Sequence, residues 1–294
     1  MAVIPNFMND IRQIATSFNG QTIALAEFER RVQIFDIYSL QVISEFDTIL
    51  DYGGKRLAIS EDGSICICGC WERQGICAYE TKTGKIVWQR KDLKKVQHIQ
   101  TLYADSSKFF AQFATGASRI FDINTGNDIE KITGAKYFFN SMFLEIDIID
   151  KSRSIQIVDR QTKKAKVNIG RQTFGTLDLD IAEDCFAISE SGGPLSCYDI
   201  VSGQLKWRIS TNENGHFIKV AFNKELDNFI GVTWPFMRRG KKKVKYINKN
   251  TGTIEREILI NQPVEIEFAL NGSVLITSDR ELINIESRER KNWA

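Results

Sequence analysis

The sequence predicts an all-β protein made of repeated four-stranded antiparallel units, with no helical segment between them. The main observation is a short cassette that recurs seven times along the 294 residues. Its centre is an acidic or amide residue that follows an aromatic or branched apolar residue. These centres are Asp36, Glu80, Asp122, Asp159, Asp199, Asn248 and Glu286. Their intervals of 44, 42, 37, 40, 49 and 38 residues are typical of a repeat architecture.

The second observation is the pattern on either side of each centre. The residues four and two positions before it are mostly apolar, which places them on one face of a strand because strand side chains alternate. Three residues after six of the centres stands Ser or Thr, and a glycine follows it in four copies. This is turn chemistry, since the side-chain oxygen accepts backbone N–H groups and glycine supplies a positive φ. We therefore expect the centres to be structural rather than catalytic.

Further turn signals mark the other strand boundaries, for example Asn19-Gly20, Asp62-Gly63 and Asn271-Gly272. Four short strands in each repeat of about 42 residues describe the blades of a β-propeller. We predict a seven-bladed β-propeller of four-stranded antiparallel blades that occupies residues 1–294 as a single domain. The last repeat is one strand short, so we expect the N-terminal strand to close the ring. The fourth copy, residues 137–173, matches poorly, and six or eight blades remain open.

Composition narrows the function classes. The net charge is +2 and the charged fraction is 26%, a balance that excludes bulk attraction to nucleic acid or to a membrane surface. No apolar run approaches the roughly 18 residues of a spanning helix. The N-terminal residues lack the pattern of a signal peptide, so we expect a cytoplasmic protein. The six cysteines stand in apolar strand patterns, where reduced thiols act as small apolar side chains.

Two motifs carry a resemblance to known families. Phe35-Asp36 and Tyr198-Asp199 stand where WD-repeat proteins carry Trp-Asp. Residues 80–88 and 199–207 each run from an acidic residue through Thr-Gly or Ser-Gly to a tryptophan, which resembles the signature of quinoprotein-like propellers. The resemblance covers the whole chain, although no true Trp-Asp pair is present. It implies a propeller whose hairpins bind partners on one face and, for the quinoprotein-like enzymes, a quinone cofactor with calcium.

Several candidates for chemistry have simpler structural explanations. Cys66, Cys68, Cys70 and Cys77 could form a tetrathiolate zinc site, but steps of roughly 7 Å along a strand favour a cysteine-lined core. His98 and His216 are far apart in sequence, and no recognised nucleophile setting accompanies either one. The pairs Glu145 with Asp147 and Asp178 with Asp180 could be paired carboxylates, but solvated strand faces explain them equally well. We expect no catalytic residue, no metal and no cofactor.

The strongest local anomaly is residues 234–245, which fall in the longest interval and which we interpret as an extended hairpin of the sixth blade. Such a basic run is also typical of a solvated turn. The alternative is a partner-binding surface, because Trp, Met and Arg are enriched at interface cores and a basic hairpin suits an acidic face. The partner-binding candidates are Trp234, Phe236, Met237, Arg238, Arg239, Lys241, Lys242 and Lys243.

The sequence therefore favours a non-catalytic interaction module that docks a protein partner through one rim face. Three alternatives remain open. The first is a bacterial immunity or defence-associated protein that neutralises an effector. The second is a quinoprotein-like oxidoreductase, and the third is nucleic-acid binding through the basic hairpin. We consider nucleic acid less favoured, because such affinity depends on many phosphate contacts, and nothing indicates a small-molecule substrate or a membrane.

Overall fold

The computed structural model describes residues 2–4, 11–17, 21–27, 31–39, 41–50, 56–71, 74–102, 105–134, 137–141, 144–171, 175–191, 193–211, 215–224, 226–234, 242–260, 265–268, 274–278 and 281–284. The elements that it describes in full are β-strands, and the pairings between neighbouring strands are antiparallel, as the period-two patterns predict. The chain divides into two compact units, Met1–Ala135 with Ala269–Ala294, and Lys136–Phe268.

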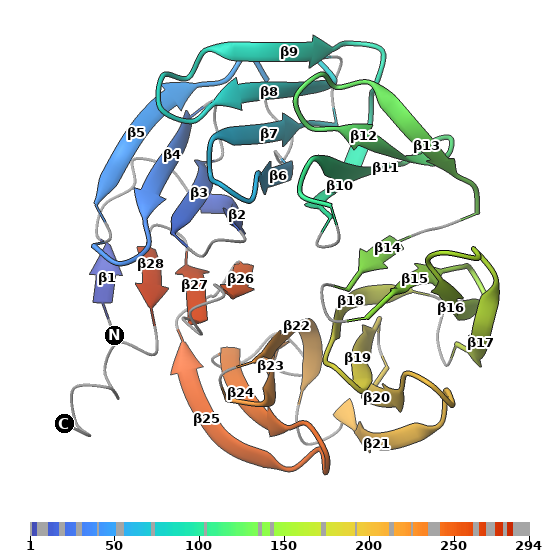
Figure 1. Ribbon diagram of the computed structural model, residues 1–294. Coiled ribbons are helices and arrows are strands. Elements are labelled where there is room, and N and C mark those ends of the chain that lie inside the picture. The colour runs from blue at the N-terminus through green and yellow to red at the C-terminus, as the bar shows by residue number, and fades with distance from the viewer. Residues whose placement is uncertain are drawn as a thin grey trace. The chain divides into compact units, whose positions relative to one another are not determined.

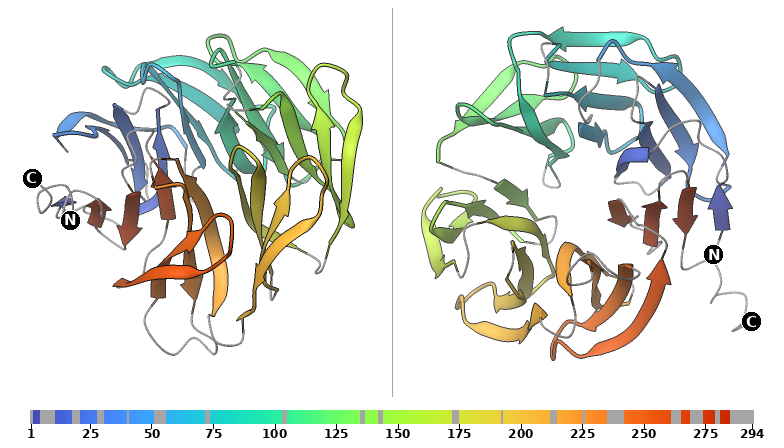
Figure 2. Two further views of the ribbon diagram at one scale, coloured as in Figure 1. Left: turned by 60° about the horizontal axis from the view of Figure 1, so that its bottom comes forward. Right: turned by 180° about the vertical axis from the view of Figure 1, so that it is seen from behind.

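The first unit contains three blades of consecutive strands, coloured blue to green in Figure 1. The first blade is β2 (Ile11–Thr16), β3 (Thr22–Glu27), β4 (Arg31–Asp36) and β5 (Val42–Asp47). The second is β6 (Arg56–Ile59), β7 (Ile65–Gly69), β8 (Ile76–Glu80) and β9 (Ile86–Arg90). The third is β10 (Val96–Thr101), β11 (Lys108–Phe113), β12 (Ser118–Asp122) and β13 (Asp128–Ile132). The first strands of successive blades contact one another, and the three blades lie side by side in each view (Figure 1, Figure 2).

The second unit contains three further blades of the same plan. The first is β14 (Tyr137–Asn140), β15 (Ile146–Asp150), β16 (Ser154–Asp159) and β17 (Ala165–Gly170). The second is β18 (Thr176–Ile181), β19 (Cys185–Glu190), β20 (Leu195–Asp199) and β21 (Leu205–Ile209). The third is β22 (His216–Asn223), β23 (Asn228–Trp234), β24 (Lys242–Asn248) and β25 (Ile254–Ile260).

The remaining described strands form a composite sheet in the order β1-β28-β27-β26. Its members are β1 (Ala2–Ile4), β28 (Glu281–Asn284), β27 (Val274–Ser278) and β26 (Glu265–Phe268). β1 pairs with β28, with Val3 opposite Ile283. The prediction of one seven-bladed ring closed by the N-terminal strand is corrected accordingly. Among the described residues six blades consist of four consecutive strands, and the described strands that follow β25 are β26, β27 and β28.

Apolar side chains join each blade to the next. In the first unit, Ile34 of the first blade packs in one cluster with Cys68 and Tyr79 of the second. In the second unit, a corresponding cluster contains Cys197 of β20 together with Phe229 of β23. Both faces of the middle strands are buried, which is why β3 and β19 are buried along their whole length. The core therefore lies between blades, and each blade depends on its neighbours for stability.

The cassette centres have the structural role that the sequence predicts. Asp122 Oδ1 accepts the backbone N–H groups of Asn124 and Thr125 at 3.0 and 2.8 Å and the Thr125 hydroxyl at 2.9 Å. Gly126, with φ +70°, donates its N–H to the Asp122 carbonyl at 2.9 Å. Asp199 makes the same set of contacts with its own turn. These bonds lower the pKa of Asp199, with the Ser202 backbone N–H as the largest cause.

The turn that follows each of the six described centres has a constant length, whereas the seventh centre, Glu286, lies outside the described residues. In all six blades five residues separate the end of the third strand from the start of the fourth, for example 81–85 between β8 and β9 and 249–253 between β24 and β25. The strand register also shifts just before each of these six centres, which is a β-bulge. The hairpins between second and third strands differ in length, from 151–153 to 235–241.

Tryptophans of two fourth strands contact the turn of the following blade. The Trp88 indole N–H donates to the Ile123 carbonyl at 2.8 Å, and the Trp207 indole N–H donates to the Lys249 carbonyl at 2.7 Å. A Cβ on Gly252 would lie 2.8 Å from the Trp207 ring. The glycine is therefore needed both for its backbone conformation and for the close approach of the ring.

Candidate protein-docking site

The predicted hairpin belongs to the blade with the longest described strands. β22 has 8 residues and β23, β24 and β25 have 7 each, whereas the described strands of the other sheets have 3 to 6. The register pairs His216 with Trp234 and Lys242 with Ile260. Gly231 permits close packing at this point, because a Cβ there would lie 2.6 Å from the Phe217 ring. The blade thus extends at the end where the sequence predicted a long hairpin.

Trp234 ends β23 and is exposed, with 41% of its surface accessible. The Lys242 ammonium, at the start of β24, lies 4.5 Å from the centroid of the Trp234 ring. A cation over an indole face at this distance is attracted by the ring quadrupole, and such a pair contributes about 0.5–1 kcal/mol at an exposed site. The pair presents a large aromatic surface and a positive charge at one place.

Lys243 and Lys245 lie on the other face of β24, since side chains alternate along a strand. Their ammonium groups bind the two oxygens of Glu257 on β25, Lys243 at 2.7 Å and Lys245 at 2.8 Å. The hydrogen bond from Lys243 is the largest cause of the lowered pKa of Glu257. The Lys245 side chain is buried, with only 1% exposed. On this face the lysines are therefore engaged within the sheet.

The structure divides the predicted partner-binding residues into two groups. Trp234, Lys242 and Lys243 lie among the described residues. Phe236, Met237, Arg238, Arg239 and Lys241 lie outside them. The sequence did not predict the ion pair between Lys245 and Glu257. The alternation of Lys243 and Lys245 signals a shared face, but the opposing Glu257 depends on the pairing register of two strands.

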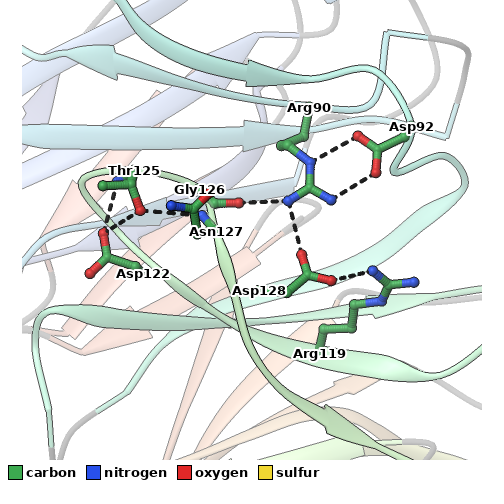
Figure 3. A network of polar contacts seen from close by, with 8 residues as sticks. All are labelled: Arg90, Asp92, Arg119, Asp122, Thr125, Gly126, Asn127 and Asp128. Atoms are coloured by element: carbon green, nitrogen blue, oxygen red, sulfur yellow. Dashed lines mark hydrogen bonds and ion pairs between the residues drawn. The ribbon is translucent and has the colours of Figure 1, made fainter.

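A second polar network joins β9 to the turn of the next blade and is drawn in Figure 3. Arg90 binds Asp92 through Nε at 2.8 Å and Nη2 at 2.7 Å, and its Nη1 donates to the Gly126 carbonyl at 2.8 Å and to Asp128 at 2.9 Å. Asp128 also accepts from Arg119. The charges of Arg90 and Arg119 are thus balanced by those of Asp92 and Asp128. The network joins two consecutive blades, because Arg90 lies on β9 and Asp128 on β13.

The cysteines lie in the core, as the sequence predicts. All six are buried and free. One expectation was wrong: the Cys66 and Cys68 sulfurs are 3.9 Å apart rather than one strand step of roughly 7 Å, because the two side chains lean toward each other. Burial is the largest cause of the raised pKa of Cys77, to about 11. The described residues contain no group of three or more ligands suited to a metal ion.

The carboxylates of the first candidate pair, Glu145 and Asp147, bind different partners. Asp147 is buried and accepts hydrogen bonds from Asn140 at 2.9 Å and Arg160 at 3.1 Å, whereas Glu145 is exposed and binds Gln161 at 2.7 Å. The two therefore do not act as a pair. His98 and His216 are both partly buried strand residues, on β10 and β22 of different units.

Asp178 and Asp180 of β18 both face the neighbouring strand β22. They accept the backbone N–H groups of Val220 at 2.9 Å and Phe222 at 2.7 Å. Burial, as the largest cause, raises the pKa of Asp180 to about 7. The two carboxylates link consecutive blades where strand pairing would otherwise leave N–H groups without acceptors. Sequence reasoning could not locate this role, since the partners lie one repeat away.

The described chain holds no helix with the length and apolar character needed to cross a membrane. No protein-family model matches the sequence, and no curated protein matches it. Among solved structures, the chain is similar to the crystal structure of the β-propeller domain of Cps50 (Swd1) from Myceliophteria thermophila. The TM-score is 0.77 at 11% identity, and the match covers 96% of this chain and 97% of the other. At this identity the likeness concerns the fold alone, and it confirms that the chain has a β-propeller fold.

Proposed function

We propose that the protein is a non-catalytic interaction scaffold that docks a protein partner through the extended end of the β22–β25 blade. The observation that carries the proposal is the exposed indole of Trp234 with the Lys242 ammonium 4.5 Å from its ring centroid. An exposed tryptophan beside a cation is the kind of residue that dominates binding energy at interfaces. The fold adds support, because loops on a rigid β scaffold commonly carry recognition.

Catalysis is not part of the proposal. The carboxylates, thiols and histidines singled out in the sequence lie apart from one another or are used in contacts within and between blades. We keep the single-domain organisation and the cytoplasmic location as proposals.

The test begins with affinity purification of the wild-type protein from its native cells and identification of the main partner. The purified partner is then titrated by calorimetry against Trp234→Ala and Lys242→Glu. We expect Trp234→Ala to weaken binding about tenfold or more, as truncation of an interface hot spot does. Lys242→Glu should weaken binding and reduce its salt dependence, because a basic contact becomes a repulsive one.

The matched control makes the same two kinds of substitution, truncation of an aromatic side chain and reversal of a charge, at positions outside the proposed surface. Tyr38 is 67% exposed and Lys82 is also exposed, and both lie in turns between third and fourth strands of the first unit. Tyr38→Ala and Lys82→Glu should leave the affinity unchanged. Equal affinity of the wild type and both Trp234 and Lys242 variants at low salt would refute the assignment of this surface.

A further inference from the structure

A second exposed tryptophan lies in the first unit, in the hairpin that joins β7 to β8. Trp71 is 44% exposed, close to the 41% of Trp234, and it follows the buried Cys70. The linker between β9 and β10, residues 91–95, lies against this hairpin. The Lys95 N–H donates to the Trp71 carbonyl at 3.2 Å, and the Val96 N–H donates to the Cys70 carbonyl at 3.1 Å.

The backbone of this linker is held firmly. Leu93 is buried, and Gly75 in the hairpin allows the linker to approach, because a Cβ there would lie 2.9 Å from the Leu93 carbonyl oxygen. Lys95 adopts a left-handed conformation with φ +59°, which carries a penalty for any residue with a Cβ. Its carbonyl accepts the Ala114 N–H at 2.9 Å, which helps to fix this conformation. A fixed backbone lowers the entropy lost on binding.

The linker presents positive charge that its own acidic residue does not offset. Lys91, Lys94 and Lys95 are exposed, and across the described part of the chain none of their ammonium groups pairs with a carboxylate. Asp92 stands between them, but Arg90 binds both of its oxygens, as Figure 3 shows. That bond lowers the pKa of Asp92 and keeps its charge matched to the arginine.

We propose that Trp71 with Lys91, Lys94 and Lys95 forms a second docking surface, which takes an acidic segment of a partner protein. An apolar side chain of that segment covers the indole, and its carboxylates meet the ammonium groups. The surface lies in a different unit from Trp234, so it goes beyond the function proposed above. Three ammonium groups on one short linker can neutralise few phosphates, whereas nucleic-acid affinity grows with the number neutralised. A single tryptophan anchor suits a short polypeptide better.

The probe is a fluorescein-labelled 12-residue peptide in which glutamate alternates with leucine and phenylalanine. Anisotropy titrations at low and moderate salt compare the wild type with Trp71→Ala and with the double variant Lys91→Gln, Lys94→Gln. We expect saturable binding, weakened about tenfold by Trp71→Ala and about fivefold by the double variant, whose two lost ion pairs each contribute modestly. Added salt should weaken binding to the wild type more than to the double variant.

The matched control is Lys82→Gln with Lys85→Gln, two exposed lysines at the opposite end of the same blade. This variant should bind the peptide as the wild type does. Loss in the control equal to that in the Lys91 and Lys94 variant would mean a general charge effect and would overturn the proposal. So would unchanged affinity in Trp71→Ala, no saturable binding up to about millimolar peptide, a range in which even weak complexes are detected, or tighter binding of a labelled 12-nucleotide oligothymidine.

Discussion

The contact between Trp207 and the turn of the following blade makes a quantitative prediction about Gly252. The glycine has φ +73°, and a Cβ would lie 2.8 Å from the Trp207 ring. Gly134 has nearly the same conformation, φ +75°, but no described atom lies within 4 Å of its Cβ position. Alanine at Gly134 should therefore cost only the left-handed backbone penalty, about 1–2 kcal/mol.

Alanine at Gly252 should cost that penalty and an overpacking term of about 1–3 kcal/mol, because the ring cannot move freely. Trp207 is 7% exposed, its N–H donates to the Lys249 carbonyl at 2.7 Å, and its ring meets Phe229 edge-on at 6.1 Å between centroids. The assay is urea unfolding followed by far-UV circular dichroism, with the free energy of unfolding obtained by linear extrapolation.

A double-mutant cycle tests the cause. In a Trp207→Ala background, which by itself should cost about 3–5 kcal/mol, Gly252→Ala should cost no more than Gly134→Ala does. The coupling between the two sites should then be about 1–3 kcal/mol, as for residues in direct contact. The reasoning is refuted if Gly252→Ala and Gly134→Ala cost the same in the wild type, or if the extra cost at Gly252 persists without the ring.

Three further predictions concern polar contacts within and between blades. Folding raises the pKa of Asp180 to about 7 from 3.8. The protonated carboxyl group therefore stabilises the fold fully below pH 3.8, and this contribution is lost as the pH rises through 7. Asp180→Asn should remove the loss, which is at most about 4 kcal/mol and less for a partly exposed group, and thermal unfolding from pH 4 to 8 measures it. Arg171 and Asp150 form a buried ion pair at 3.2 Å, so Arg171→Leu should destabilise by about 3–5 kcal/mol, and a cost under 1 kcal/mol in urea unfolding would contradict the pairing. Trp88→Phe keeps an aromatic ring but loses the N–H bond to the Ile123 carbonyl, which should cost about 1 kcal/mol; no change in the unfolding midpoint would argue against that bond.

The local parts of the fold could be predicted from the sequence. Period-two alternation and the turn residues around Asp122 and Asp199 depend on neighbours within five positions, and the structure confirms both the strands and the turns. The likeness to a solved β-propeller domain confirms the β-propeller fold. The prediction of a closed ring of seven blades was wrong. Which strands form the sheet that contains β1 and β28 depends on pairing between distant ends of the chain, and a local pattern does not reveal it.

The candidate site shows the same division. Trp234 and Lys242 were predicted as a surface because their residue types and place in a long interval are local facts. The pairing of Lys245 with Glu257 was not predicted, since it requires the register of β24 against β25. The aspartates of β18 were read as a solvated face, whereas Asp178 binds the N–H of Val220, 42 residues away. Contacts at the distance of one repeat leave no pattern that a local reading can detect.

The two kinds of turn have opposite consequences for redesign of this chain. The five-residue turns after the third strands pack against the preceding blade, as Gly126 and Gly252 do against Trp88 and Trp207. An insertion in such a turn would therefore disturb two blades together. The connections at the opposite end already vary from three residues (151–153) to seven (235–241); the longer one joins two strands of 7 residues, β23 and β24, and the shorter one joins strands of 5 and 6 residues, β15 and β16. New binding loops should therefore be grafted at that end, where the blades of this chain already differ in the length of the connection.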